Sequence, residues 1–143
     1  MKIIKHFVPF IMVWMIVCSS ESFAQNLQKE KAAVKAYYEG FETHNWNLVA
    51  NQLADGFTFT TPINDHISIK EFKDSCWGTN RFFKKFNFIK LTESGNDLIL
   101  LVEISTTDSK LVRNIDIYTF TKGKIKSVEV FFGAGSKYPG NTE

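Results

Sequence analysis

Apolar side chains in the first half of the chain recur at helical spacing. Val34, Tyr37, Tyr38 and Phe41 stand at i, i+3, i+4 and i+7, which places them on one face of an α-helix. We expect Asn26 to cap this helix, so that it begins at Leu27. The pattern predicts two more helices, one from about 46 to 54 that ends at Asp55-Gly56, and one opened by a capping box at Ser68–Glu71 that runs to about 77 and ends at Gly78.

The rest of the chain alternates apolar and polar positions with the period of β-strands. Residues 57–61 predict a strand that ends at Pro62, followed by a loop over 63–67. Four further runs at about 85–92, 98–106, 111–121 and 124–132 are joined by short polar turns, which predicts an antiparallel meander. The expected fold class is therefore α+β, a cone-shaped curved antiparallel sheet wrapped by three N-terminal helices.

The N-terminal segment has the features of a secretion signal. Lys2 and Lys5 precede an apolar run over 7–17, which is shorter than the ~20 residues that span a bilayer. Ser22 and Ala24 then supply small residues at the −3 and −1 positions of a cleavage site. We expect residues 1–24 to be a cleaved signal peptide, 25–133 to be one domain and 134–143 to be a flexible tail. The protein is then exported, either to a periplasm or to the medium.

Two alternatives remain for this segment. Cys18 is available for a lipoprotein signal, but Val17 is bulky where such a signal needs a small residue. The segment can also stay uncleaved and act as an anchor. In either case the chain would remain attached to a membrane, whereas cleavage after Ala24 leaves no membrane association.

Removing the signal changes the net charge, the cysteine count and the number of Phe residues in the mature chain. The segment carries two lysines and one glutamate, so the formal net charge falls from +2 to +1. A nearly neutral chain gives no electrostatic reason to bind nucleic acid. Cys76 is then the one remaining cysteine, so no intramolecular disulfide is expected. Three of the 14 Phe leave with the signal, and the other rings must build a large core or line an apolar cavity.

With this order of elements, the chain resembles the nuclear transport factor 2-like superfamily, in particular its SnoaL-like branch. The matching segments are Tyr37–Phe41 in the first helix, Asn45–Leu48 at the start of the second, Leu53–Pro62 around the first strand and Phe120–Ile125 in the last hairpin. The family holds isomerases, polyketide cyclases, dehydratases, hydrolases and many binders that are not enzymes. The resemblance therefore implies a fold and leaves the activity open.

The ketosteroid isomerases of this superfamily can be compared residue by residue. The resemblance places their helix-borne Tyr, which hydrogen-bonds a developing oxyanion, at Tyr37, and their protonated Asp at Asp116. Their general base falls on Thr61, and a Thr hydroxyl has no useful basicity at neutral pH. A standard ketosteroid isomerase is therefore not expected. The SnoaL-like cyclases place an acidic base inside the same cavity, and the resemblance makes Asp116 the best candidate for that role, with Tyr37 expected to assist.

Strand alternation then predicts which residues share the cavity with Asp116. If Asp116 faces inward, so does every second residue of its strand, and neighbouring strands and helices contribute the rest. Burial among apolar groups would raise the pKa of its carboxyl group. Alternatively, Asp116 lies on the convex face, or it pairs with Asn114 or Arg113. The expected pocket residues are Tyr38, Phe41, Trp46, Phe59, Thr61, Trp77, Val102, Ile104, Asn114, Tyr118, Phe120, Val128 and Phe132.

Other reactive residues have structural interpretations that we prefer. We expect Cys76 to be a packed thiol, His44 to end the first helix, and Asp65-His66 to lie in a loop without a third partner. The basic and aromatic run over 81–88 is typical of single-strand binders, but in a nearly neutral exported chain it predicts the start of a strand. No spacing typical of a metal or cofactor site occurs, and none is expected.

Two functional hypotheses follow. The first is an exported domain that binds a small, largely apolar molecule in its cone and acts on it through Asp116. The second is a non-catalytic dimeric scaffold whose pocket is filled by its own rings, such as Phe59, Phe120 and Phe132. Ile99 and Leu101 put apolar side chains on the opposite face of their strand, so we expect a homodimer through the outer sheet face.

Overall fold

The computed structural model describes residues 8–132, with side chains from residue 24 onward. Two helices come first, α1 (Val8–Glu42) and α2 (Trp46–Ala50), followed by strands β1 (Leu53–Thr61) and β2 (Asn64–Ser68). A short helical segment then consists of α3 (Ile69–Glu71), one π-helical turn (Phe72–Cys76) and a 3₁₀ segment (Trp77–Phe82). Strands β3 (Phe83–Ser94), β4 (Asp97–Thr106), β5 (Leu111–Thr121) and β6 (Lys124–Phe132) complete the fold.

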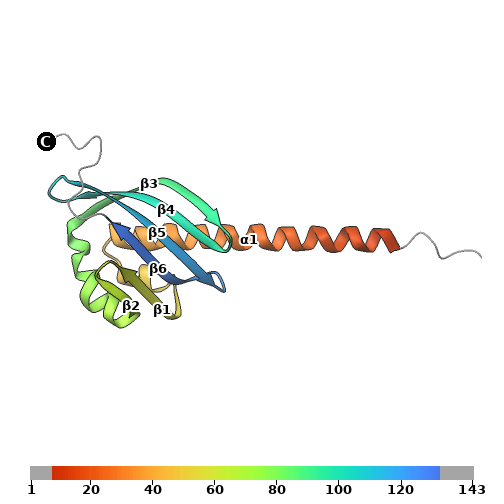
Figure 1. The fold of residues 1–143 in the computed structure, drawn as a ribbon, viewed down its shortest axis with the longest axis horizontal. Helices are drawn as coiled ribbons and strands as arrows, with labels where there is room; N and C mark the ends of the chain where they lie inside the picture. The colour runs from red at the N-terminus through yellow and green to blue at the C-terminus, as the bar shows by residue number, and fades with distance from the viewer. Residues whose placement is uncertain (1–7, 133–143) are drawn as a thin grey trace, which may run out of the picture.

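The six strands form one curved sheet in the order β2-β1-β6-β5-β4-β3. Strands β3 to β6 are an antiparallel meander, as the alternating pattern predicts, and β1 joins it by pairing parallel to β6. Figure 1 shows α1 lying across one face of this sheet, with the α3 segment closing one end. The predicted α+β fold, a curved open sheet covered by N-terminal helices, is confirmed.

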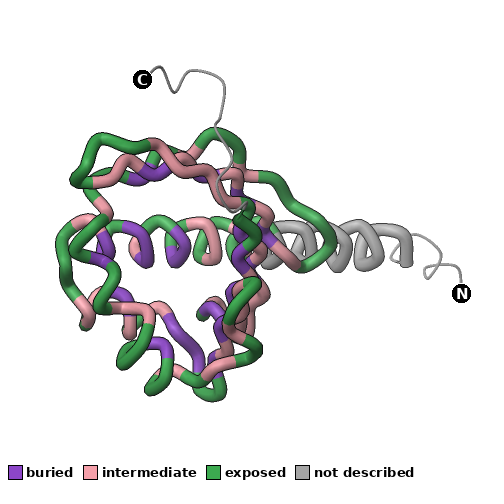
Figure 2. Tube along the Cα trace, turned by 60° about the vertical axis from the view of Figure 1, so that its left-hand side comes forward, coloured by how far each residue is buried: buried purple, intermediate pink, exposed green. Residues whose placement is uncertain are grey.

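Side-chain alternation along the central strands separates an inner face from an outer face. On β4 the even-numbered residues from Leu98 to Ile104 are all buried, and the odd-numbered residues between them are partly exposed. The same parity continues on β5, where Asp116 pairs with Leu100 on one side and with Val130 on the other. Figure 2 shows the buried positions gathered between α1 and the sheet. The hydrophobic core therefore fills the concave side.

Local chemistry explains several element ends. Ser68 accepts a hydrogen bond from the backbone N–H of Glu71, whose carboxylate accepts one from the Ser68 N–H, so the predicted capping box is present. Lys122 and Gly123 both have positive φ, which suits the tight turn between β5 and β6. Asn45 caps α2 by accepting from the Leu48 N–H. These contacts set where the short helices and the last hairpin begin.

Four local predictions were wrong. Helix α1 continues through Asn26, which therefore caps nothing, and α2 ends at Ala50 because Leu53 and Ala54 belong to β1. Asp55-Gly56 lies inside β1, where Gly56 has a φ of +71° and the pairing with β6 shifts register. Residues 63–67 are mostly strand β2, and Gly78 lies within the 3₁₀ segment, not at its end. Pairing with β6 and β1 draws residues 53–56 and 64–67 into the sheet, whereas the helix at Asn26 and the 3₁₀ segment at Gly78 simply continue.

The two ends of the chain bear on the domain boundaries. Residues 1–7 and 133–143, which include the start of the predicted signal and the predicted tail, lie outside the described residues. Helix α1 extends beyond the sheet at its N-terminal end (Figure 1). Within the described part of the chain, no helix is both long and apolar enough to cross a membrane. The predicted cleavage after Ala24 stays a prediction.

Candidate functional site

Asp116 is a buried acid on the inner face of the sheet. Its side chain is 4% exposed and lies among Leu100, Val102, Tyr118 and Val130, all of them buried. The inward direction that alternation predicts for this residue is therefore correct. A carboxyl group in such surroundings has lost most of its hydration, which makes its ionisation unfavourable.

Two tyrosine hydroxyl groups hold one oxygen of this carboxyl group. The Tyr38 hydroxyl, from α1, donates to Asp116 Oδ2. The Tyr118 hydroxyl lies 2.8 Å from that of Tyr38 and 3.3 Å from the same Oδ2, within reach of both. All three residues are buried. The Asp116–Tyr38–Tyr118 cluster thus joins helix α1 to strand β5 through polar contacts inside an apolar core.

The cluster alters the acidity of its members. Burial raises the pKa of Asp116 from 3.8 to about 6, and the hydrogen bonds from Tyr38 and Tyr118 act in the opposite direction because they favour the carboxylate. Burial also raises the pKa of both tyrosines well above the usual value, so both stay protonated donors near neutral pH. Asp116 is therefore the group of the cluster that gains or loses a proton near neutrality.

The second oxygen of Asp116 has a different environment. Asp116 Oδ1 is fully buried and receives no hydrogen bond from the described residues. Buried polar atoms nearly always have a partner, so an unpartnered one marks a place where a further group is needed. The carboxyl group therefore has one oxygen held by the protein and one free to meet a ligand or a water molecule.

Tyr38, not the neighbouring Tyr37, bonds Asp116 in the structure, and the predicted assisting role of Tyr37 stays a prediction. Tyr37 is also buried, and its ring packs edge-on against Tyr38 and Tyr118. The hydrogen bond to Asp116, however, comes from Tyr38, which the sequence placed among the pocket residues. Adjacent residues of a helix point about 100° apart, and both directions fall within the wide apolar face of α1. Spacing alone does not separate them.

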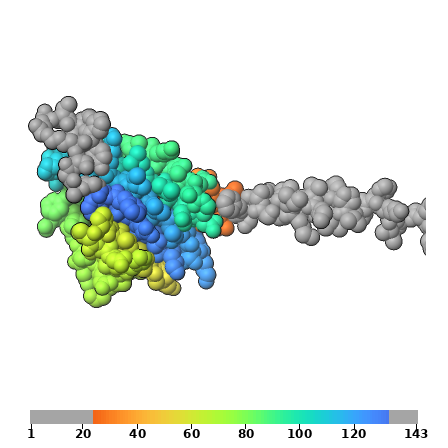
Figure 3. Space-filling model, in the orientation of Figure 1, coloured from red at the N-terminus to blue at the C-terminus, as the bar shows by residue number. Residues whose placement is uncertain are grey.

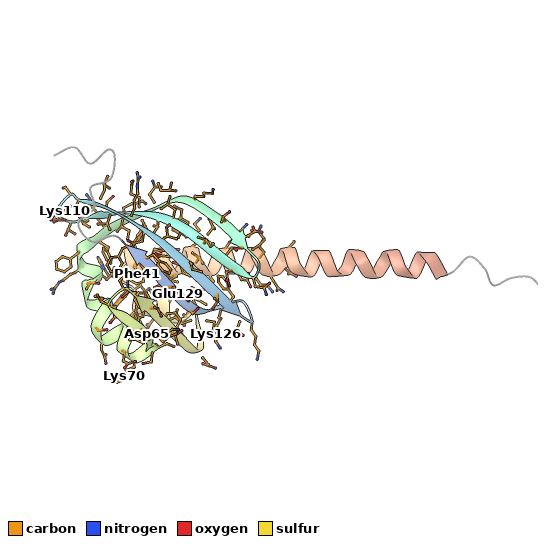
Figure 4. All side chains as sticks on the ribbon, viewed as in Figure 1. Phe41, Asp65, Lys70, Lys110, Lys126 and Glu129 are labelled. Atoms are coloured by element: carbon orange, nitrogen blue, oxygen red, sulfur yellow. The ribbon has the colours of Figure 1, made fainter. Side chains whose placement is uncertain are left out.

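Other predicted pocket residues fall into three groups. Those in the shared core are Tyr38, Phe41, Phe59, Val102, Ile104, Tyr118 and Val128. Those that are half-buried at its edges are Trp46, Thr61, Trp77, Asn114 and Phe120. Phe132 is 38% exposed at the end of β6, so it does not plug the cone. In Figure 4, Phe41 lies inside the body of the protein, whereas Lys70 and Lys110 lie at its rim.

Ring packing fills the end of the core near the α3 segment. Phe72 is 1% exposed and its ring lies 4.5 Å from that of Phe59 and 5.8 Å from that of Phe57, between ring centroids. Phe41 and Trp46 complete the contacts around it. This part of the cone is closed by side chains.

Two surface hollows lie beside the core. The larger, of about 450 Å³, lies between α1 and β3 and is lined by Lys35, Tyr38, Glu39, Glu42 and residues 85–88. We name it the α1–β3 hollow. The smaller, of about 200 Å³, lies between α1 and the β3–β4 turn. Tyr38 belongs to both the larger hollow and the cluster, so this hollow comes within one side chain of Asp116.

The remaining reactive residues lie elsewhere. Thr61 Oγ1 accepts hydrogen bonds from Ile63 and Asn64 and so holds the turn after β1. His66 is exposed and interacts with the neighbouring Asp65, and the exposed His44 contacts buried Asn80. Cys76 is a half-buried free thiol. Among the described residues, no group of three or more His, Cys, Asp or Glu has the arrangement of a metal site.

Comparisons with known proteins agree with this fold. The model of the SnoaL-like domain family matches residues 34–128, which include all three members of the cluster. No curated protein matches the chain. A solved nuclear transport factor 2-like protein of unknown function from Cytophaga hutchinsonii is 24% identical, with a TM-score of 0.61 over 73% of this chain and 89% of that one.

Two further structures share the fold at lower identity. A Kribbella flavida protein named as a proposed ketosteroid isomerase is 15% identical, with a TM-score of 0.61 over 78% of this chain and 83% of that one. TerC, co-crystallised with polyporic acid, is also 15% identical, with a TM-score of 0.60 over 73% of this chain and 92% of that one. These likenesses concern the fold alone.

Proposed function

Because the chain belongs to the SnoaL-like domain family, we propose that it binds a small, largely apolar molecule in its cone and that Asp116 contacts this molecule directly. The observation that carries the proposal is the carboxyl group of Asp116, whose Oδ2 is held by Tyr38 and whose Oδ1 is buried without a partner among the described residues. A ligand hydroxyl group would donate to Oδ1 of the carboxylate, whereas a ligand carbonyl group would accept from the protonated carboxyl group, and either contact would complete its hydrogen bonding.

Acid–base catalysis is the chemistry that this carboxyl group supports. An acid with a pKa near 6 exchanges protons readily at neutral pH, which is what a general acid or base requires. Tyr38 and Tyr118 keep the carboxyl group oriented and supply hydrogen bonds that strengthen as it becomes charged. The reaction class is an isomerisation, cyclisation or dehydration beside a carbonyl group.

A standard ketosteroid isomerase remains disfavoured. Thr61 stands where those enzymes have their base, and here its hydroxyl is engaged in the turn after β1. Any catalytic proton transfer would therefore rely on Asp116, the member of the cluster that titrates near neutral pH. Among structures with the same fold, TerC was crystallised with polyporic acid, which supports a small-molecule role for such a cone.

A non-catalytic scaffold is the second candidate, and the closed end of the core favours it. The rings around Phe72 leave that part of the cone filled.

Apolar side chains also occupy the outer face, where Ile115 is 46% exposed and Phe131, its partner on β6, is 52% exposed. Figure 3 shows β1, β6 and β5 side by side on one face. We propose that a second copy covers this face, which a monomer in light scattering at micromolar concentration would contradict.

Export is the third part of the proposal. The charged start, apolar run and small residues at 22 and 24 support cleavage after Ala24. Mass spectrometry of the exported protein should give an N-terminus at Gln25, and any other N-terminus contradicts the proposed cleavage site.

A thermal-shift screen of apolar carbonyl and hydroxyl compounds tests the ligand proposal. Wild-type protein and the Asp116→Asn variant are screened in parallel, with Thr119→Val, on the outer face of β5, as the matched control. A compound that stabilises wild type and Thr119→Val but not Asp116→Asn supports the site. Equal stabilisation of all three contradicts a role for Asp116, and stabilisation of none favours the scaffold.

A further inference from the structure

A second unpartnered oxygen lies beside Asp116. Asn114 Oδ1 is fully buried and, like Asp116 Oδ1, receives no hydrogen bond from the described residues. The two residues stand two apart on β5 and share its inner face, so their Cα atoms are separated by roughly 6.6 Å, the rise of two residues in a strand. Two buried hydrogen-bond acceptors thus lie in a row on one wall of the core.

The surroundings of Asn114 are apolar on both sides. Its register partners are Val102 on β4 and Phe132 on β6. Neither side chain can donate a hydrogen bond, so the Asn114 oxygen depends on a group from outside the sheet. Leaving a buried acceptor without a donor is costly, and a ligand that supplies the donor removes that cost.

Building on the proposed function, we propose that Asn114 is a specificity-determining residue and that the site takes apolar molecules with two hydroxyl groups on a rigid frame. One hydroxyl donates to Asp116 Oδ1 and the other to Asn114 Oδ1. A ketone or an ether oxygen at the second position has no hydrogen to donate and would face the Asn114 oxygen as a second acceptor. The site therefore discriminates by hydrogen-bond donors, not by size.

The α1–β3 hollow shares Tyr38 with the Asp116–Tyr38–Tyr118 cluster, and we take it as the proposed approach to the two oxygens. Its lining includes Tyr38, which donates a hydrogen bond to Asp116, and Phe88 on β3. Phe88 pairs with Val102 on β4, and Val102 pairs with Asn114 on β5. The rings of Tyr38 and Phe88 contact each other edge-on, with centroids 5.1 Å apart. A ligand entering from this hollow would have to displace these two rings to reach the two oxygens.

Two ligands of nearly equal shape test the role of Asn114. The probes are 2,6-dihydroxynaphthalene, with two hydroxyl groups, and 6-methoxy-2-naphthol, in which a methyl ether replaces one of them. Affinities are measured by fluorescence titration at pH 7.5 for wild type, Asn114→Leu, Asn114→Ala and the outer-face control Thr119→Val. Thermal melts of each variant verify folding, and the alanine variant serves if the leucine variant does not fold.

We expect the dihydroxy compound to bind wild type and Thr119→Val about tenfold more tightly than the methoxy compound, since one buried hydrogen bond separates them. The preference should disappear in Asn114→Leu and Asn114→Ala. No preference in wild type, or a preference that survives in the Asn114 variants, overturns this inference while leaving the Asp116 site standing. Failure of both compounds to bind wild type counts against the proposed function itself.

Discussion

Tyr38 donates a hydrogen bond to Asp116, and this contact joins helix α1 to strand β5 between residues 78 positions apart. A buried carboxyl group costs stability when it ionises, and the hydroxyl group of Tyr38 reduces that cost without removing it. The same pair thus sets both the acidity of the candidate site and the stability of the fold around it.

The raised pKa of Asp116 predicts a pH-dependent stability. The folded protein holds this proton up to a pH of about 6, while the unfolded chain releases it near 3.8, so the folded state binds more protons between these values. Stability should therefore fall as pH rises from about 4 to 6 and stay level above that. The expected loss from this group is about 3 kcal/mol, at 1.36 kcal/mol for each pKa unit.

Urea denaturation of wild type and Asp116→Asn across pH 4 to 8 isolates this contribution. Asparagine keeps the size of the side chain but does not titrate, so the difference between the two curves should change by about 3 kcal/mol in that window. Parallel curves would show that Asp116 has an ordinary pKa in the folded state.

Replacing Tyr38 with Phe should raise the pKa of Asp116 further. The lost hydrogen bond favoured the carboxylate, and a hydrogen bond to a charged group is worth enough to raise the pKa by about 1. Tyr37→Phe is the matched control, because Tyr37 lies beside the cluster without bonding to Asp116 in the structure. Carbon-13 NMR titration of the Asp116 carboxyl group measures both. A larger rise in the Asp116 pKa from Tyr37→Phe than from Tyr38→Phe would mean that Tyr37, not Tyr38, is the donor.

Gly40→Ala should destabilise the protein by about 1–3 kcal/mol through overpacking. A Cβ atom at Gly40 would lie 2.5 Å from Val49 Cγ2 and 3.1 Å from the carbonyl oxygen of Asn45. Gly40 is thus the position at which α2 approaches α1 closely. In Gly78→Ala, by contrast, the added Cβ meets no atom within 4 Å. Urea denaturation should separate the two variants, and equal effects would mean that α2 does not pack here.

Phe72→Ala should cost about 3–5 kcal/mol, the range for removing a fully buried Phe side chain. Phe72 is 1% exposed and holds together the rings of Phe41, Trp46 and Phe59. Phe82→Ala, at a site 49% exposed, should cost less than about 1 kcal/mol. Differential scanning calorimetry of the two variants measures this difference. Similar melting temperatures would indicate that the aromatic end of the core is loosely packed.

Strand alternation predicted the inner face of the sheet because alternate residues of a central strand share one environment, buried on one side and partly exposed on the other. Leu100, Val102 and Asp116 all point inward as that rule requires. The capping box at Ser68 was also predictable, since it depends on two side chains and their own backbone. Local and periodic chemistry therefore determined most of the fold that positions Asp116.

Other features depend on contacts between distant segments and were not predictable in the same way. Leu53 and Ala54 join β1 because β6 lies beside them, although their local pattern resembles the end of a helix. The choice of Tyr38 over Tyr37 depends on the rotation of α1 against β5, which helical spacing leaves undetermined. The parallel pairing of β1 with β6 likewise arises only in three dimensions.

The most direct test of the central claim is the pH dependence of ligand affinity. The claim is that the Asp116 carboxyl group itself contacts the bound molecule. Isothermal titration of 2-naphthol from pH 5 to 8 should show affinity for wild type rising several-fold through a pH of about 6, because an ionised carboxylate accepts a hydroxyl hydrogen bond more strongly. Asp116→Asn should give a flat profile with weaker binding. The same pH profile in both proteins would contradict the claim.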